Sequence, residues 1–206
     1  MKAVLISIRP EWCEKIASGE KTVDVRKTRP KIEPPFKVYV YCTLPPKEEL
    51  FTHGCIREYA RELIRLQDGR IVYDYGMRLC CDPEDRPYSQ DNFLCQKVIG
   101  EFVCDNVAKI LNFLTHFGVE GRPERELNTI ARASCLDYMD MLGYFGTDKD
   151  GYAWHISDLK IYDNPKKLSE FCSYNARIYI GENGYPMPTH EITRPPRSWC
   201  YVEGGE

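Results

Sequence analysis

A short helix-to-strand segment near the N-terminus constrains the fold more than any other stretch of this chain. Proline suits the first turn of a helix and glycine the left-handed residue after the last turn. Pro10 and Gly19 therefore bracket a helix predicted over residues 11–18. An apolar, β-branched strand over residues 4–8 precedes it, and a strand over residues 22–27 follows it directly. The chain thus opens with strand, helix and strand.

The second of these strands has a polar face. Successive side chains of a strand point to opposite faces, so Thr22, Asp24 and Arg26 share one face and two valines take the other. Lys21 stands at the start of this row. Two interpretations stay open at this point: a solvated edge strand, or a row of side chains that faces a ligand.

The remaining elements are expected further along the chain. Strands are predicted over 37–43, 97–110, 152–162 and 176–180, and the aromatic segment 194–202 is expected to pack back on the fold through Trp199. Gly100 indicates a bulge or bend within its strand. Ser134 is interpreted as the first residue of a capping box that opens a helix over 135–144. Residues 163–165, which end in proline, are expected to end the preceding strand.

Two segments are interpreted as insertions, over about residues 44–96 and 111–133. In the first, residues 58–66 have the spacing of one helix face. The same residues could instead enter a hairpin, because Asp68 and Gly69 form a strong turn signal between two apolar runs.

Composition excludes several classes of protein. The 206 residues are 43% hydrophobic and 29% charged, as in an ordinary globular protein, and one domain over residues 1–206 is expected. No apolar run is long enough to span a membrane, and no signal peptide is recognised, so a cytoplasmic protein is expected. Ten cysteines include no C-x-x-C pair, so free thiols and neither metal nor cofactor are expected.

Charge is distributed unevenly. The net charge of −3 argues against a broad phosphate-binding surface. However, residues 1–47 hold ten Lys and Arg against five Asp and Glu, whereas residues 48–96 hold six against ten. A basic first quarter allows a local site for an anionic ligand. The acidic insertion 48–96 raises a different hypothesis, a protein-interaction module.

Three places in the chain together carry a resemblance to a known family. Gly19, Lys21, Asp24 and Arg26 are spaced as in a G-x-K-x-x-E-x-R pattern, with aspartate in place of glutamate; the other places are residues 98–102, and 151–158 with the closing 195–199. In these places the chain resembles the ASCH domain of the PUA-like superfamily. The resemblance implies an α+β fold, in which a small twisted β-barrel is flanked by short helices and a cleft lies beside the pattern.

The resemblance also implies a ligand class, namely RNA or a modified nucleoside or nucleotide. Some relatives are similar to small amidohydrolases that remove an acyl group from a modified cytidine, and others resemble ribonucleases. The acyl-removing relatives have a threonine where this chain has Asp24. They also have a glutamate near Ser134 that has no counterpart here.

Two roles for the polar strand follow. In a binding protein, Lys21 and Arg26 would contact phosphate or a base carbonyl, and Asp24 would accept from an exocyclic amine. In a metal-independent hydrolase, Lys21 and Asp24 would be the acid–base pair, provided that Lys21 is desolvated. The further candidates for ligand contact are three aromatic residues and one histidine: Tyr41, Trp154, Trp199 and His155. The tryptophans have core packing as their alternative.

Overall fold

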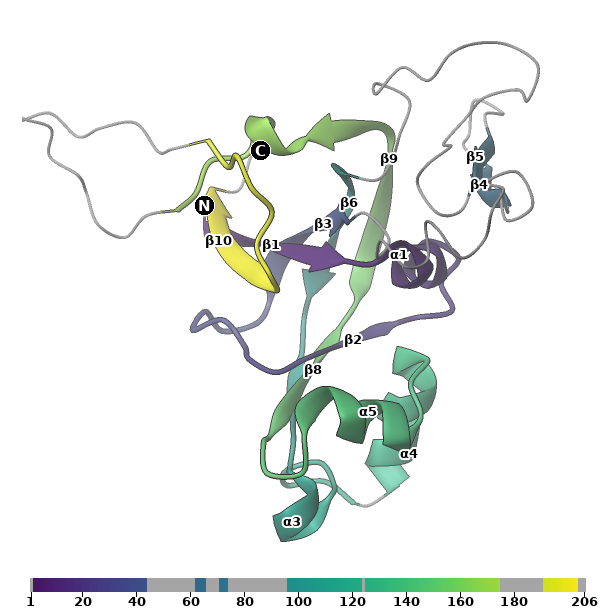
Figure 1. Ribbon diagram of the computed structural model, residues 1–206, viewed down its shortest axis with the longest axis vertical. Helices are drawn as coiled ribbons and strands as arrows, with labels where there is room; N and C mark the ends of the chain where they lie inside the picture. The colour runs from purple at the N-terminus through teal and green to yellow at the C-terminus, as the bar shows by residue number, and fades with distance from the viewer. Residues whose placement is uncertain are drawn as a thin grey trace, which may run out of the picture. The chain divides into compact units, whose positions relative to one another are not determined.

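The computed structural model describes residues 2–43, 62–65, 71–73, 96–123, 125–174 and 191–203. It has a mixed α+β fold (Figure 1). The chain divides into two compact units. One, here called the terminal unit, comprises residues 1–14, 37–101 and 160–206; the other, the central unit, comprises 15–36 and 102–159. The expectation of a single domain stays a prediction.

The elements follow one another along the chain as a strand-rich series with four α-helices among the described residues. The strands are β1 (Lys2–Ile8), β2 (Val23–Arg26), β3 (Phe36–Cys42), β4 (Glu62–Arg65), β5 (Ile71–Tyr73), β6 (Lys97–Cys104), β7 (Val107–Ile110), β8 (Gly151–His155), β9 (Ser157–Lys167) and β10 (Trp199–Glu203). The helices are α1 (Pro10–Ala17), α3 (Phe113–His116), α4 (Arg125–Ser134) and α5 (Tyr138–Phe145). No helix among the described residues has the length and apolar character needed to cross a membrane.

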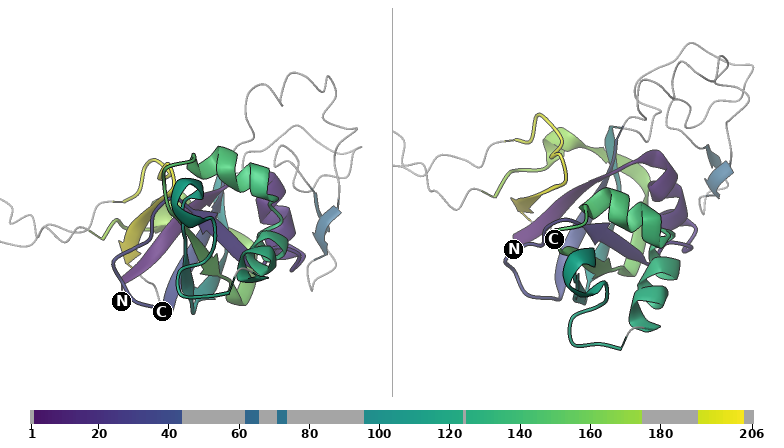
Figure 2. Two further views of the ribbon diagram at one scale, coloured as in Figure 1. Left: turned by 90° about the horizontal axis from the view of Figure 1, so that it is seen from below. Right: turned by 60° about the horizontal axis from the view of Figure 1, so that its bottom comes forward.

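A five-stranded sheet in the order β10-β1-β3-β6-β9 carries most of the terminal unit. β1 runs parallel to β3 and antiparallel to β10, so the last strand lies beside the first (Figures 1 and 2). Trp199 stands opposite Ile6 in this register, which confirms that the aromatic tail packs back on the fold. The core on one side of this unit consists of buried side chains: Ala3, Leu5, Tyr39, Tyr41, Val98, Phe171, Ile192 and Val202.

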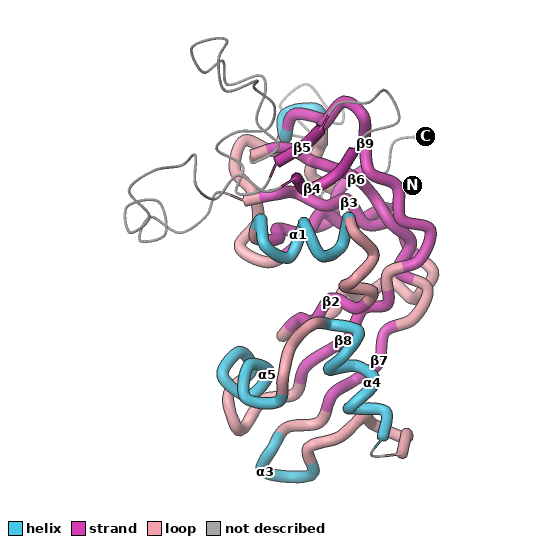
Figure 3. Tube along the Cα trace, turned by 90° about the vertical axis from the view of Figure 1, so that its right-hand side faces the viewer, coloured by secondary structure: helices cyan, strands magenta, loops and turns pink. Residues whose placement is uncertain are grey.

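The central unit is built on a three-stranded antiparallel sheet in the order β2-β8-β7. One face of this sheet packs against α4 and α5 (Figure 3). The buried core between them holds Val23, Val25, Ala108, Ile110 and Ala153 from the strands and Leu127, Ile130, Met141 and Phe145 from the helices. Burying each large aliphatic or aromatic side chain contributes about 1.5–3 kcal/mol, so this face fixes the register of β2.

The α+β class expected from the sequence is confirmed, whereas closure into a barrel is not seen. Among the described residues the strands form three separate sheets, of five, three and two strands. The closed barrel therefore stays a prediction.

Several boundaries differ from the sequence-based expectations. The strand expected over 97–110 is divided into β6 and β7 at Asp105 and Asn106. The strand expected over 152–162 is interrupted at Ile156, and Asp158 just beyond has a φ of 47°. β9 continues through Pro165, so the predicted stop there is wrong. β9 is an edge strand, where a missing backbone donor is tolerated.

The helix after residue 134 also begins later than predicted. Asp137 is its N-cap and forms a capping box with Asp140, whereas Ser134 is the last residue of α4. The capping box predicted at Ser134 is therefore wrong, because that residue terminates α4, a helix that was not predicted from the sequence. Of the segment 111–133, Leu127 and Ile130 belong to the central core.

The segment 44–96, predicted to be an insertion, is described only in part. β4 and β5 pair antiparallel, which confirms the hairpin alternative for residues 62–65 and makes the helix alternative wrong there. The predicted turn at Asp68 and Gly69, and the strand expected over 176–180, lie outside the described residues.

Gly151 provides a stability test of the central core. A Cβ added at Gly151 would lie 2.2 Å from Cζ of Phe145, a ring that is itself buried. We expect Gly151→Ala to lower the free energy of unfolding by about 1–3 kcal/mol, the usual cost of overpacking. Gly143 in α5 is the matched control, because a Cβ there meets no atom within 4 Å. Gly143→Ala is expected to stabilise by about 0.5–1 kcal/mol. Equal urea midpoints for the two variants would contradict this packing.

Candidate functional site

The turn between α1 and β2 is held in place by backbone hydrogen bonds on both sides. Gly19 has a φ of 78°, the left-handed conformation that ends a helix at low cost for glycine. The amide of Lys21 donates to the carbonyl of Lys15 at 2.8 Å, and the amide of Thr22 donates to the carbonyl of Ala133 at 2.8 Å. The position of Lys21 is therefore set by both α1 and α4.

The side chain of Lys21 is buried and points to the C-terminal end of α4. It is 3% exposed, and its Nζ donates to the carbonyl oxygen of Ser134 at 2.8 Å. Carbonyl groups at a helix C-terminus lack partners within the helix and carry partial negative charge. Lys21 thus occupies a position that favours a cation. Its Nζ also lies 3.8 Å from Oδ1 of Asp24, an ion-pair distance too long for a direct hydrogen bond.

Asp24 stands between two cationic side chains. Arg26 Nε donates to Asp24 Oδ2 at 2.6 Å, and both residues are 6% exposed. We call Lys21, Asp24 and Arg26 the Lys21 cluster. β2 is an edge strand of its sheet, as one interpretation predicted, but it is not solvated, because all four of its residues are buried. The predicted alternation of polar and apolar faces is confirmed, since both valines enter the core.

Burial changes the acid–base chemistry of Lys21. Desolvation lowers the pKa of Lys21 below its ordinary value, and this effect outweighs the opposing charge of Asp24, which raises it. Arg26 lowers the pKa of Lys21 further, by repulsion between like charges. A lysine in this state loses its proton more readily than an exposed lysine does, as an acid–base or nucleophilic amine requires.

The end of α4 beside Lys21 has an unusual residue in a common motif. The amide of Leu136 donates to the carbonyl of Ala131 at 3.2 Å, and the amide of Cys135 donates to the carbonyl of Arg132 at 3.1 Å. These two bonds form a Schellman motif, whose left-handed residue is usually glycine. Here that residue is Cys135, with a φ of 56°.

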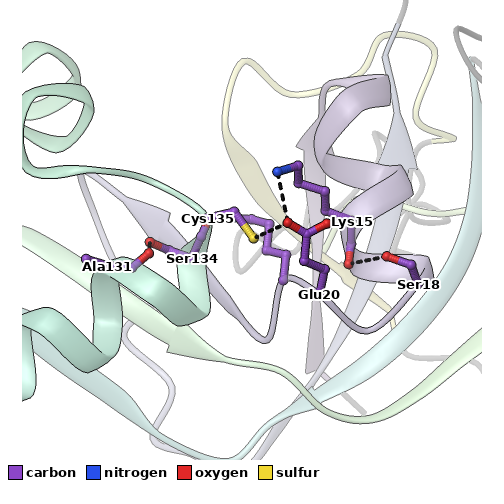
Figure 4. Close-up of polar contacts among 7 residues, drawn as sticks. Lys15, Ser18, Glu20, Ala131, Ser134 and Cys135 are labelled. Atoms are coloured by element: carbon purple, nitrogen blue, oxygen red, sulfur yellow. Dashed lines mark hydrogen bonds and ion pairs between the residues drawn. The ribbon is translucent and has the colours of Figure 1, made fainter.

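The Cys135 thiol contacts an acidic side chain. Its Sγ donates to Glu20 Oε1 at 3.7 Å, and the same oxygen accepts from Lys15 Nζ at 3.1 Å (Figure 4). Burial is the largest cause that raises the pKa of Cys135, and the Glu20 charge adds to it. A thiol with a raised pKa is a poor nucleophile, so Cys135 is assigned no chemical role.

The aromatic and histidine candidates lie in different surroundings. Trp154 is paired with Asp24 across the sheet and so shares its face, but its side chain is 0% exposed and packs edge-on against Phe36. It offers no stacking surface in this structure. His155 takes the opposite face; it is half-exposed, and its Nδ1 lies 2.6 Å from Asp105 Oδ1.

The other two aromatic candidates belong to the terminal unit. Tyr41 is buried in the core of that unit. Trp199 is partly exposed and contacts the Tyr201 ring edge-on, with centroids 5.3 Å apart. Of the seven predicted site residues, the structure brings together the Lys21 cluster and Trp154. Ligand contact by Tyr41, Trp154, His155 and Trp199 stays a prediction.

Two neighbours of the cluster were not identified from the sequence. One is the Ser134 carbonyl, a backbone group whose role as a hydrogen-bond acceptor cannot be predicted from the residue type. The other neighbour is Tyr144 in α5. Burial raises the pKa of its phenol, the charge of Arg26 lowers that pKa, and the charge of Asp24 raises it. Nothing in the sequence placed α5 beside β2. Among the described residues, no three His, Cys, Asp or Glu side chains gather closely enough to hold a metal ion.

Comparison with solved structures identifies the fold. The crystal structure of ASCH from Zymomonas mobilis matches with a TM-score of 0.50 and 17% identity, over 98% of this chain and 87% of that one. A variant of that protein with one tyrosine replaced by phenylalanine matches with a TM-score of 0.50 and 16% identity, over 98% and 91%. A serine-to-alanine variant matches with a TM-score of 0.51 and 16% identity, over 98% and 88%.

The chain therefore has the fold of an ASCH domain, as the sequence resemblance implied. No protein-family model matches the sequence, and no curated protein matches it. At this level of identity the likeness concerns the fold alone, so the activity has to be argued from the Lys21 cluster.

Proposed function

We propose that this protein binds RNA or a modified nucleoside or nucleotide at the Lys21 cluster and hydrolyses it. In this proposal Lys21 is the acid–base group and Asp24 is its charged partner. The observation that carries the proposal is the burial of Lys21, which lowers its pKa while a carboxylate stays within 3.8 Å. A buried lysine with a lowered pKa favours chemistry over simple charge contact.

The proposed chemistry needs one proton to move twice. The neutral amine of Lys21 accepts a proton from the attacking water or hydroxyl as the new bond to carbon or phosphorus forms. The resulting ammonium then gives that proton to the leaving nitrogen or oxygen as the old bond breaks. Asp24 stabilises the ammonium between these events, and the 2.6 Å hydrogen bond from Arg26 fixes the orientation of Asp24.

Binding without hydrolysis is the second candidate. The segment that follows β2 presents basic side chains to solvent: Lys27 and Lys31 are exposed and Arg29 is partly exposed. Such side chains contact phosphates and make affinity depend on salt. The third hypothesis, an interaction module in the acidic segment 48–96, lies almost wholly outside the described residues and stays a prediction.

The pH dependence of hydrolysis tests the proposed role of Lys21. If the neutral amine is the base, kcat/KM should rise with pH and reach a plateau above the apparent pKa of Lys21. That apparent pKa should lie below the ordinary lysine value of about 10.4. The substrates to compare are a single-stranded RNA, the DNA of the same sequence and an N-acylated cytidine. No turnover of any of them, or a pH profile without this rise, would leave binding alone as the function.

The same pKa shift predicts how stability depends on pH. The unfolded chain holds the Lys21 proton up to about pH 10.4, whereas the folded chain releases it earlier because its pKa is lowered. Between the folded-state pKa of Lys21 and about pH 10.4, the unfolded state binds more protons than the folded state does. The free energy of unfolding should therefore rise with pH over this range. Urea titrations of the wild type and Lys21→Met should show this rise only in the wild type.

A further inference from the structure

The Tyr144 ring lies beside the end of β2 with part of its surface open. The side chain is 38% exposed, and Lys27 Nζ lies 5.0 Å from the centroid of its ring. Lys27 directly follows β2 and is exposed. An aromatic face and an ammonium group therefore stand together, immediately after Arg26 of the Lys21 cluster.

The phenol end of Tyr144 faces the same segment. Burial is the largest cause that raises the pKa of this phenol, while the charge of Arg26 and the backbone N–H of Lys27 lower the pKa and the charge of Asp24 raises it. The ring thus reaches from α5 to the end of the strand that carries the cluster. This contact joins two parts of the chain that are far apart in the sequence.

The helix that presents the ring is well anchored. Met141 and Phe145 of α5 are buried in the central core, and the Phe145 ring lies against Gly151 and within 5.3 Å of the Tyr144 ring, centroid to centroid. Asp137 caps the helix N-terminus. An aromatic side chain held in this way needs little further ordering to receive a planar ligand.

We propose that Tyr144 and Lys27 form a nucleotide subsite in which the base stacks on the Tyr144 ring and Lys27 contacts the phosphate. Bases stack on exposed aromatic rings because every base has a π-face. When a phosphate draws Lys27 away from the ring, the ring face becomes free for the base. This inference rests on the proposed function and names the recognition element of the same site.

Nucleotide binding by two variants of Tyr144 tests the inference. The probes are CMP and AMP, with ribose 5-phosphate as the ligand that lacks a base, measured by calorimetry. Tyr144→Phe keeps the ring and should bind the nucleotides within about two- to threefold of the wild type. Tyr144→Leu removes the ring and should bind them about ten- to 100-fold more weakly, as expected for loss of one stacking contact. Ribose 5-phosphate should bind both variants and the wild type equally.

Tyr138→Leu is the matched control. Tyr138 lies in the same helix and is 40% exposed, but its hydroxyl contacts Asn128 and its ring contacts Phe117. This variant should bind nucleotides as the wild type does. Lys27→Gln should weaken CMP and AMP but leave cytidine unchanged, because only the nucleotides carry a phosphate. It should also flatten the salt dependence of binding.

Three results would overturn the inference. If Tyr144→Leu binds CMP and AMP as the wild type does, while Lys21→Met loses turnover, the stacking subsite is wrong and the proposed function stands. If ribose 5-phosphate binds as tightly as CMP, recognition is through phosphate alone. If the wild type neither binds nor hydrolyses any of the nucleotides and RNAs, the proposed function fails and the subsite with it. If Tyr144→Leu does not fold, NMR of the wild type replaces it, with the Tyr144 ring protons assigned through Tyr144→Phe. A nucleotide-induced shift of these protons supports the inference, and no shift contradicts it.

Discussion

Replacing Lys21 with methionine is expected to slow hydrolysis strongly while leaving the protein folded. A positioned acid–base group contributes about 10²–10⁴-fold to the rate, so kcat should fall by that factor. Methionine fills much of the same volume without a charge. The substitution removes the donor to the buried Ser134 carbonyl, while Asp24 keeps its hydrogen bond from Arg26, so the free energy of unfolding near neutral pH should fall by about 1–3 kcal/mol.

Two measurements separate this prediction from a purely structural role of Lys21. The free energy of unfolding by urea reports the stability, and kcat on the RNA, DNA or N-acylated cytidine substrate that the wild type turns over reports the chemistry. Lys109→Met is the control, because Lys109 is a partly exposed lysine of the central unit paired with Glu120 and Asp150. It should lose no activity. Full activity in Lys21→Met would rule out the acid–base role.

Asp24→Asn is expected to cause the largest loss of stability. Asp24 is the anion between the Lys21 and Arg26 side chains, and all three are buried. Removing one partner of a buried ion pair typically costs about 3–5 kcal/mol, because the remaining charge stays in an apolar environment. Here two cations would remain, so we expect a loss at the upper end of that range or a failure to fold at 37 °C.

A surface pair and a double variant serve as controls. Glu33→Gln breaks an exposed pair with Arg29, in which the Glu33 side chain is 80% exposed, and should cost less than about 1 kcal/mol. Lys21→Met combined with Asp24→Asn should be more stable than Asp24→Asn alone, because the double variant leaves only Arg26, and not both Lys21 and Arg26, buried without the Asp24 carboxylate. If Asp24→Asn costs no more than Glu33→Gln, the cluster does not depend on its ion pairs.

Much of the central unit's polar strand could be predicted from local patterns. Pro10 and Gly19 bracket α1 within a residue or two of the observed ends, and the alternation along β2 placed its valines in the core. These features depend on backbone conformations and side-chain directions that each residue carries with it. The partnership of Asp24 with Arg26 also follows from that alternation, because two residues apart on a strand share a face.

The role of Ser134 could not be predicted in the same way. The sequence suggested a helix N-cap at this residue, but it ends α4 and gives its carbonyl to Lys21. A serine side chain is a common N-cap, so the residue type favoured that role. Every residue has a backbone carbonyl, so the residue type does not indicate which carbonyl accepts a hydrogen bond from Lys21. Likewise, three tryptophan or tyrosine residues were considered as stacking faces, and the exposed ring beside the cluster is Tyr144.

By itself, the sequence determined which residues of the N-terminal segment share a face, that this face is polar, and that the chain resembles an ASCH domain. Only the tertiary structure decided that Asp24 and Arg26 on this face are buried, whereas Thr22 is exposed. Lys21 and the carbonyl that holds it lie 113 positions apart, and a contact over that separation depends on how α4 packs against β2. Burial is a property of the packed chain rather than of the residue, and it is burial that lowers the pKa of Lys21 and gives the cluster its proposed chemistry.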